Sequence, residues 1–156
     1  MPVPNRKSAF SLLEIVIVVA IVAILAAIGV PRLSRGSKGA ANAALAGDLR
    51  LLRGAIDHYA TDHGGAYPTL AAIGKQLTQF TDYDGVCRTA RDKTHIYGPY
   101  LRRIPPLPVG LHKGDTGISN ADGADVGWIY NDKIGTIRAN CGVTELDART
   151  KAFRDY

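Results

Sequence analysis

Residues 10–30 read FSLLEIVIVVAIVAILAAIGV, and Glu14 is the only charged residue among these 21. An α-helix of this length extends about 32 Å, which is enough to cross a hydrocarbon core of about 30 Å. The run is longer than the roughly 7–15 apolar residues of an ordinary secretory signal, and no ordinary small-residue cleavage site follows it. The sequence therefore predicts a transmembrane helix over residues 10–30.

Glu14 needs an explanation, because an ionised carboxylate inside lipid costs about 2.5–3.5 kcal/mol. One interpretation places it near the membrane surface, one turn into the helix, where it reaches water. The other gives it a positively charged partner after processing or assembly. The residues ahead of the run favour the second interpretation, because a basic, polar leader (MPVPNRKSA, residues 1–9) directly precedes Phe-Ser-Leu-Leu-Glu.

This leader followed by FSLLE resembles the class III signal peptide of type IV pilins and of the pseudopilins of type II secretion. The resemblance implies that a prepilin peptidase cuts between Ala9 and Phe10, and that the new N-terminus at Phe10 is methylated. It also implies that Glu14 pairs with the α-ammonium group of Phe10 on a neighbouring subunit, in a filament whose core is packed from these helices. Two opposite charges buried together are tolerated where a single charge is not. Ala9 stands where the family usually has glycine, and both residues are small.

Pro31 lies 22 residues into the implied mature chain and matches a proline that is common in the family. Proline inside a helix removes a backbone donor and crowds the preceding turn, so we expect a bend near residues 27–31 in a helix that continues. The continuation, residues 31–63, carries one apolar stripe at steps of four and three, and Gly64 and Gly65 end it. The stripe consists of Leu45, Leu49, Leu52, Ile56 and Tyr59.

Residues 64–156 form a predicted globular head. Leu70, Ile73, Leu77 and Phe80 suggest a short helix over residues 70–80 with Thr69 as its cap. Residues 97–108, YGPYLRRIPPLP, suit an extended connector, and the alternation in residues 126–140, VGWIYNDKIGTIRAN, predicts a β-hairpin followed by a C-terminal loop. We expect Trp128 to anchor the core of the head against the long helix. The fold class expected from this pattern and the resemblance is α+β, a long N-terminal stalk helix packed on a small antiparallel sheet.

Residues 114–127, GDTGISNADGADVG, offer hard oxygen donors on a flexible loop, which is the chemistry that Ca²⁺ requires. Major pseudopilins carry a structural Ca²⁺ in a loop that precedes a tryptophan-bearing strand, so the resemblance implies a calcium site here. Its candidate side-chain ligands are Asp115, Asp122 and Asp125. The alternative is a metal-free loop in which Asp and Gly serve only the backbone turns.

Cys87 and Cys141 are the two cysteines, they enclose 53 residues, and neither belongs to a CxxC motif. Outside the cytosol such a pair is expected to form a disulfide, which would contribute roughly 4 kcal/mol by loop closure, whereas inside the cytosol two free thiols are expected. Type IV pilins often use a C-terminal disulfide, and pseudopilins often use calcium. His58 and His63 are five residues apart, so they do not share a helix face, and we expect solvated helix-end residues rather than metal ligands.

The sequence contains no nucleophile elbow, Gly-rich phosphate loop, dinucleotide fingerprint or zinc-ligand spacing, so we do not expect an enzyme. The net charge is +5 and falls to +3 once the leader with Arg6 and Lys7 is removed. No cluster of basic residues interleaved with aromatics follows, so nucleic acid is not an expected partner.

We therefore predict a structural subunit of a type IV pilus-like filament, most closely a major pseudopilin of a type II secretion system. The alternative is a major pilin of a surface pilus used in adhesion, motility or DNA uptake, and a third reading is a membrane-anchored binding module. The resemblance implies as partners further copies of the chain, the prepilin peptidase, the inner-membrane platform, its motor ATPase, and membrane lipid before assembly. It implies a single-pass inner-membrane precursor with a periplasmic head, assembled into a periplasmic or extracellular filament.

Overall fold

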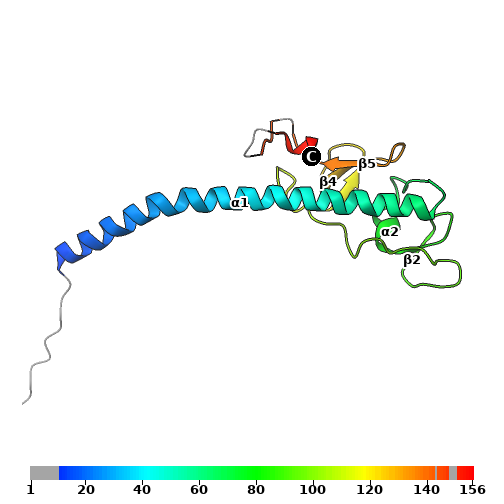
Figure 1. Ribbon diagram of the computed structural model, residues 1–156, viewed down its shortest axis with the longest axis horizontal. Coiled ribbons are helices and arrows are strands. Elements are labelled where there is room, and N and C mark those ends of the chain that lie inside the picture. Colours follow the sequence, from blue (N-terminus) through cyan, green and yellow to red (C-terminus); the bar gives the residue numbers. More distant parts are fainter. Residues whose placement is uncertain (1–10, 143, 148–150) are drawn as a thin grey trace, which may run out of the picture. The chain divides into compact units, whose positions relative to one another are not determined.

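The computed structural model describes residues 11–142, 144–147 and 151–156, and it leaves the side chains of residues 28–36 undescribed. The fold is α+β, as predicted (Figure 1). Its contacts divide it into an N-terminal unit that ends at Ser37 and a head unit, Lys38–Tyr156. The elements are α1 (Leu12–Asp62), α2 (Ile73–Thr78), β1 (Phe80–Thr81), β2 (Cys87–Arg88), β3 (Gly117–Ser119), β4 (Val126–Asn131), β5 (Thr136–Ala139) and the 3₁₀ helix η1 (Phe153–Asp155).

The N-terminal unit contains the first part of α1, whose backbone stays helical through Pro31. This agrees with the predicted continuation of the helix beyond the proline. Among the residues that the structure describes, no helix has both the length and the apolar character that a membrane crossing needs. The two ends of the predicted span lie outside the described part, because Phe10 and the side chains of residues 28–30 are not described. The same holds for the side chain of Pro31, so its predicted role cannot be compared with the structure.

The core of the head unit forms where the apolar stripe of α1 meets the sheet. All five stripe residues are at most 3% exposed, and Trp128 is fully buried in the same cluster, which confirms the predicted anchor. Two aromatic side chains also satisfy buried carbonyl groups. The indole of Trp128 donates to the carbonyl of Pro105 at 2.8 Å, and the hydroxyl of Tyr130 donates to the carbonyl of Pro68 at 3.0 Å. Strand β4 is therefore tied to two separate proline-containing segments.

The end of α1 is formed by two glycines in the left-handed region, with φ of 65° at Gly64 and 91° at Gly65. The amide of Gly65 donates back to the carbonyl of Ala60 at 2.7 Å, which satisfies one of the last free carbonyls of the helix. His63 is only 4% exposed, so the prediction of a solvated histidine is wrong at this position, whereas His58 is exposed.

His63 is buried because it joins the end of α1 to β1. Its ring stacks on Tyr59 with centroids 3.8 Å apart, and Nδ1 lies 2.8 Å from the Tyr59 carbonyl. Nε2 lies 3.1 Å from the Thr81 hydroxyl and 2.9 Å from the Asp82 carbonyl. These polar partners on both sides make burial of the imidazole tolerable.

The main sheet has the order β3-β4-β5, and β4 and β5 form the predicted antiparallel hairpin. The predicted all-antiparallel sheet is wrong in one respect, because β3 runs parallel to β4, so the sheet is mixed. A parallel pair needs a crossover rather than a tight turn, and residues 120–125 return the chain to the start of β4. Gly135 has a φ of 66° and completes the β4–β5 turn.

The segment between α1 and the connector differs from its prediction in detail. Helix α2 begins at Ile73, its N-cap is Ala72, and no side chain caps it, so the predicted cap at Thr69 is wrong. The carbonyl of Thr69 instead accepts the amides of Ala72 and Ile73, which forms a turn ahead of the helix. The two-residue strands β1 and β2 follow, and β1 begins at Phe80, which was predicted to end the helix.

Candidate functional site

The head loop, residues 107–126, closes against β4 by close backbone contacts. The amide of Gly117 donates to the carbonyl of Asp125 at 2.9 Å, and the amide of Leu107 donates to the carbonyl of Asp115 at 2.9 Å. A Cβ atom at Gly117 would lie 2.3 Å from the Asp125 oxygen, and one at Gly127 would lie 2.2 Å from the Asp115 oxygen. Only glycine allows these approaches, so Gly117 and Gly127 determine how closely the loop lies on the sheet.

Two of the three predicted calcium ligands meet at a histidine that the sequence analysis did not single out. Nδ1 of His112 lies 3.1 Å from Oδ2 of Asp115, and Nε2 lies 3.0 Å from Oδ1 of Asp122. The His112 side chain is 19% exposed, while that of Asp122 is 73% exposed. The imidazole therefore bridges two carboxylates that belong to different turns of the head loop.

Asn140, at the end of β5, holds the same carboxylate from the other side. Its amide nitrogen donates to Oδ1 of Asp122 at 2.8 Å and to the carbonyl of Val126 at 2.7 Å. The Asn140 hydrogen bond is the main cause that lowers the pKa of Asp122, and the charge and hydrogen bond of His112 add to it. The loop between β3 and β4 is thus tied to the end of β5.

This arrangement does not fit the predicted calcium site. A Ca²⁺ ion needs several oxygen atoms that converge without hydrogen-bond donors between them. Here one oxygen of each carboxylate is already engaged, because Oδ2 of Asp115 lies 3.1 Å from the His112 ring, and Oδ1 of Asp122 lies 3.0 Å from that ring and accepts the Asn140 amide. Asp125 contributes its backbone carbonyl to the Gly117 amide. Among the residues that the structure describes, no group of three or more His, Cys, Asp or Glu side chains could hold a metal ion.

The predicted disulfide is not formed in the structure, because Cys87 and Cys141 are both free thiols. Their surroundings differ. The Cys141 thiol is buried beside Gly110, and burial together with the charge of Glu145 raises its pKa to about 11. The Cys87 thiol is partly buried near the carbonyl of Gly85, and burial also raises its pKa.

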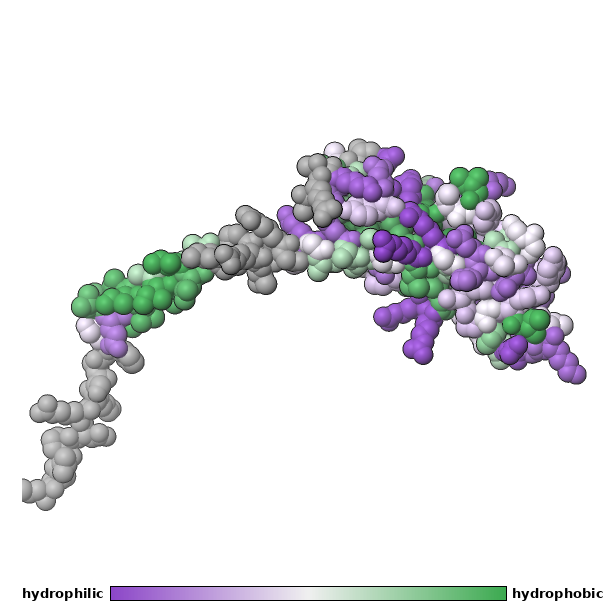
Figure 2. All heavy atoms as spheres, viewed as in Figure 1, coloured by the Kyte–Doolittle hydropathy of each residue, from purple (hydrophilic) through white to green (hydrophobic). Residues whose placement is uncertain are grey.

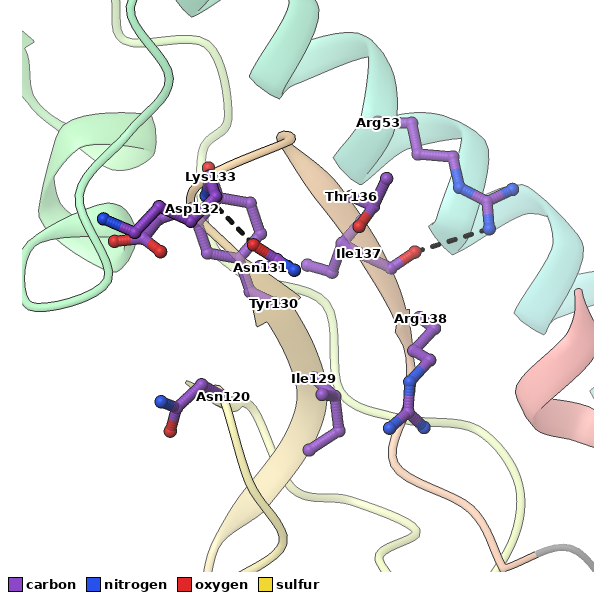
Figure 3. Close-up of a pocket in the computed structure, with 10 residues that line it drawn as sticks. All are labelled: Arg53, Asn120, Ile129, Tyr130, Asn131, Asp132, Lys133, Thr136, Ile137 and Arg138. Atoms are coloured by element: carbon purple, nitrogen blue, oxygen red, sulfur yellow. Dashed lines mark hydrogen bonds between the residues drawn. The ribbon is translucent and has the colours of Figure 1, made fainter.

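An open groove of about 650 Å³ is lined by residues of β4, β5 and the turn between them, together with Arg53 and Asn120 (Figure 3). Its lining includes three basic side chains, Arg53, Lys133 and Arg138, and one acidic side chain, Asp132. The guanidinium of Arg53 reaches from α1 to the carbonyl of Ile137 at 3.4 Å and to that of Tyr156 at 2.9 Å. Because these carbonyls lie on β5 and at the C-terminus, Arg53 joins both to the helix.

The described N-terminal part of α1 presents a different surface. Its large apolar side chains from Leu12 to Leu25 are all at least half exposed, and hydrophobic residues dominate this region in Figure 2. Glu14 lies in the first turn of α1, where a carboxylate is favoured by the positive end of the helix dipole. A helix that is apolar on all sides is normally buried, either in the core of a large protein or in a membrane.

Residues 4–30 match the family model of the prokaryotic N-terminal methylation motif. The chain carries this methylation motif. The motif covers residues 4–9 of the leader and the start of α1 with Glu14, and it is typical of type IV pilins and pseudopilins. No curated protein and no solved structure matches the chain.

The methylation motif implies a membrane-anchored pilin-type precursor that a prepilin peptidase processes and that assembles into a filament. Ala9 and Phe10, the predicted cleavage and methylation residues, lie within the motif and outside the described residues. Glu14 and Pro31 lie on α1, and their predicted roles in assembly stay predictions.

Proposed function

We propose that the chain is a structural subunit of a type IV pilus-like filament, of the kind that forms the major part of a type II secretion pseudopilus. The observation that carries the proposal is the methylation motif over residues 4–30 in a helix whose described apolar side chains are exposed from Leu12 onward. Exposed apolar surface on this scale requires lipid or other protein as a partner. The role is structural rather than catalytic.

In this proposal, cleavage after Ala9 frees the amine of Phe10, and that amine pairs with Glu14 of a neighbouring copy. The apolar helices then exchange lipid for one another, and the Glu14 pair fixes their register. A charge pair restricts the helices to one alignment because a shifted register leaves a carboxylate unpaired in an apolar environment. The head keeps its own core and forms the wall of the filament.

A surface pilin is the alternative. Of two observations on the head, one favours the pseudopilin and the other favours the pilin. The two free thiols favour the pseudopilin, because type IV pilins often carry a disulfide near the C-terminus. The poor fit of Asp115 and Asp122 to calcium favours the pilin, because calcium belongs to the resemblance with major pseudopilins. The run HGGAYPT at residues 63–69 and the connector at residues 97–108 are the sequence features that decide our choice.

The proposal is tested by expressing the full chain together with a prepilin peptidase and the assembly machinery. N-terminal sequencing should yield FSLLE, and Glu14→Ala should abolish filaments while leaving the amount of processed subunit unchanged. Asp57→Ala, which removes an exposed carboxylate farther along α1, serves as the matched control and should assemble normally. Protein that still begins at Met1, or normal filaments from the Glu14→Ala variant, would overturn the proposal.

Electron microscopy of cells that produce the chain at its natural level separates the two kinds of filament. A secretion pseudopilus predicts no long surface fibres, together with loss of protein secretion when the gene is deleted. Long surface fibres with unchanged secretion would establish the pilin alternative.

A further inference from the structure

The head loop contains one side chain that links parts of the loop distant in sequence. His112 contacts Asp115, three residues away, and Asp122, ten residues away, with both nitrogen–oxygen distances close to 3 Å. β3 lies between the two carboxylates in sequence, so the imidazole holds together the turns before and after this strand. Neither contact depends on any part of the N-terminal unit.

The chemistry of the three groups explains why they are arranged in this way. An ionised carboxylate only accepts hydrogen bonds, so two carboxylates brought close together need a donor or a cation between them. Both ring nitrogens of His112 lie within hydrogen-bond distance of a carboxylate oxygen, so this one ring stands between the two acidic groups. The side chains of His112 and Asp115 are 19% and 28% exposed, so their contact is partly shielded from water, whereas Asp122 is 73% exposed.

The two ends of the bridge are themselves fixed. Asp115 is held by its backbone, which donates to the His112 carbonyl at 3.1 Å and accepts the Leu107 amide at 2.9 Å. Asp122 is held by Asn140 at 2.8 Å. The bridge therefore joins the first part of the head loop to the end of β5, and it closes the loop that precedes the strand of Trp128.

We propose that His112 closes the head loop in place of a divalent cation, so that the stability of the head depends on this imidazole and not on calcium. The proposal follows because the His112 and Asn140 contacts occupy carboxylate oxygens that a calcium ion would need. It does not require that the chain forms filaments. It assigns His112 a cross-linking role, with Asp115 and Asp122 as its two acceptors.

The test uses the full chain purified in detergent and follows thermal unfolding by the fluorescence of Trp128, the single tryptophan. For the wild-type protein we expect the same Tm in EDTA and in millimolar calcium, and no heat of calcium binding in calorimetry. His112→Ala should lower the Tm by about 2–8 °C, the range expected for loss of its two polar contacts in a domain of this size. His58→Ala is the matched control, because His58 is exposed on α1, and its Tm should not change.

A double-mutant cycle shows whether the bridge itself is responsible. Asp122→Asn keeps the shape of the side chain and removes its charge, and it should lower the Tm less when His112 is already alanine than in the wild-type protein. Additive effects of the two substitutions, an unchanged Tm in His112→Ala, or a wild-type Tm that rises with calcium or falls with EDTA would each overturn the proposal. If His112→Ala does not fold, the metal measurements on the wild-type protein and the Asp122→Asn variant still decide it.

Discussion

Leu25 and Leu52 are the same residue type on the same helix, yet Leu25 is 64% exposed and Leu52 is completely buried. The first belongs to the N-terminal unit, in which every described large apolar side chain from Leu12 onward is at least half exposed. The second belongs to the stripe that packs under Trp128 in the head unit. The apolar side chains of the second part are therefore buried by the head, whereas those of the first part are left exposed.

The two parts of α1 are therefore stabilised by different contacts. Burying a leucine side chain is worth about 1.5–3 kcal/mol, and the head obtains this within its own chain. The N-terminal part can obtain it only from lipid or from other molecules. Substitutions in the head should therefore act on unfolding, whereas substitutions in the N-terminal part should act on insertion and assembly.

The largest difference is expected for one substitution made in the two places. Leu52→Ala should lower the free energy of unfolding by about 2–5 kcal/mol, because it leaves a cavity in the core of the head. Leu25→Ala should change it by less than about 0.5 kcal/mol, because the side chain is 64% exposed and leaves no cavity when it is shortened. Chemical denaturation of both full-length variants in detergent, followed by Trp128 fluorescence, measures the two values. Equal losses would show that the two parts of α1 do not have separate roles.

A smaller effect is expected for a pair of glycines in the head. Gly127→Ala places a Cβ atom 2.2 Å from the Asp115 carbonyl oxygen, so the head loop must move away from β4, at a cost of roughly 1–3 kcal/mol. Gly123→Ala meets only a methyl group of Val126 at 3.6 Å and should be close to neutral. The same denaturation experiment compares them. If Gly127→Ala is as stable as Gly123→Ala, the loop does not contribute to the stability of the head.

Periodicity along the chain allowed much of the fold to be predicted. The steps of four and three from Leu45 to Tyr59 identified the buried stripe, and the alternation around Trp128 identified the hairpin. Both signals arise within one element, because the side chains that share a face are set by the helix or strand period. The methylation motif was likewise found from a contiguous run of residues.

Features that depend on two distant segments were not predicted. His63 follows a polar helix end and was expected to be solvated, but it is buried by Thr81 and Asp82, which lie 18 and 19 residues farther along the chain. His112 was missed because its second acceptor, Asp122, is brought close by the parallel pairing of β3 and β4, which no local pattern reveals. The i, i+3 spacing of His112 and Asp115 was the one local signal available.

The two cysteines provide a test that does not depend on unfolding. In the native protein, iodoacetamide at pH 8 should modify Cys87 before Cys141, because the pKa of Cys141 is raised to about 11 and only about one thiol in a thousand is then ionised. Mass spectrometry after denaturation should find two alkylated cysteines without prior reduction. A mass that shows no alkylation until a reductant is added would mean that the disulfide expected from sequence does form.

The smallest effect concerns an exposed carboxylate in the segment after β2. The pKa of Asp92 is lowered because its carboxylate accepts the backbone and side-chain N–H groups of His95 and the amide of Thr94. A group whose pKa is lower in the folded state stabilises the protein above its unfolded pKa of about 3.9, and this contribution is lost as the pH falls further. Asp92→Asn should therefore lower the Tm slightly at pH 7, and it should reduce the fall in Tm between about pH 4 and pH 2.

Asp84→Asn is the control, because Asp84 is an exposed carboxylate for which the described structure contains no hydrogen bond. Since Asp92 belongs to the head unit, its substitution should leave the amount of assembled filament at pH 7 unchanged, and a loss of assembly would show that this segment also meets a neighbouring molecule.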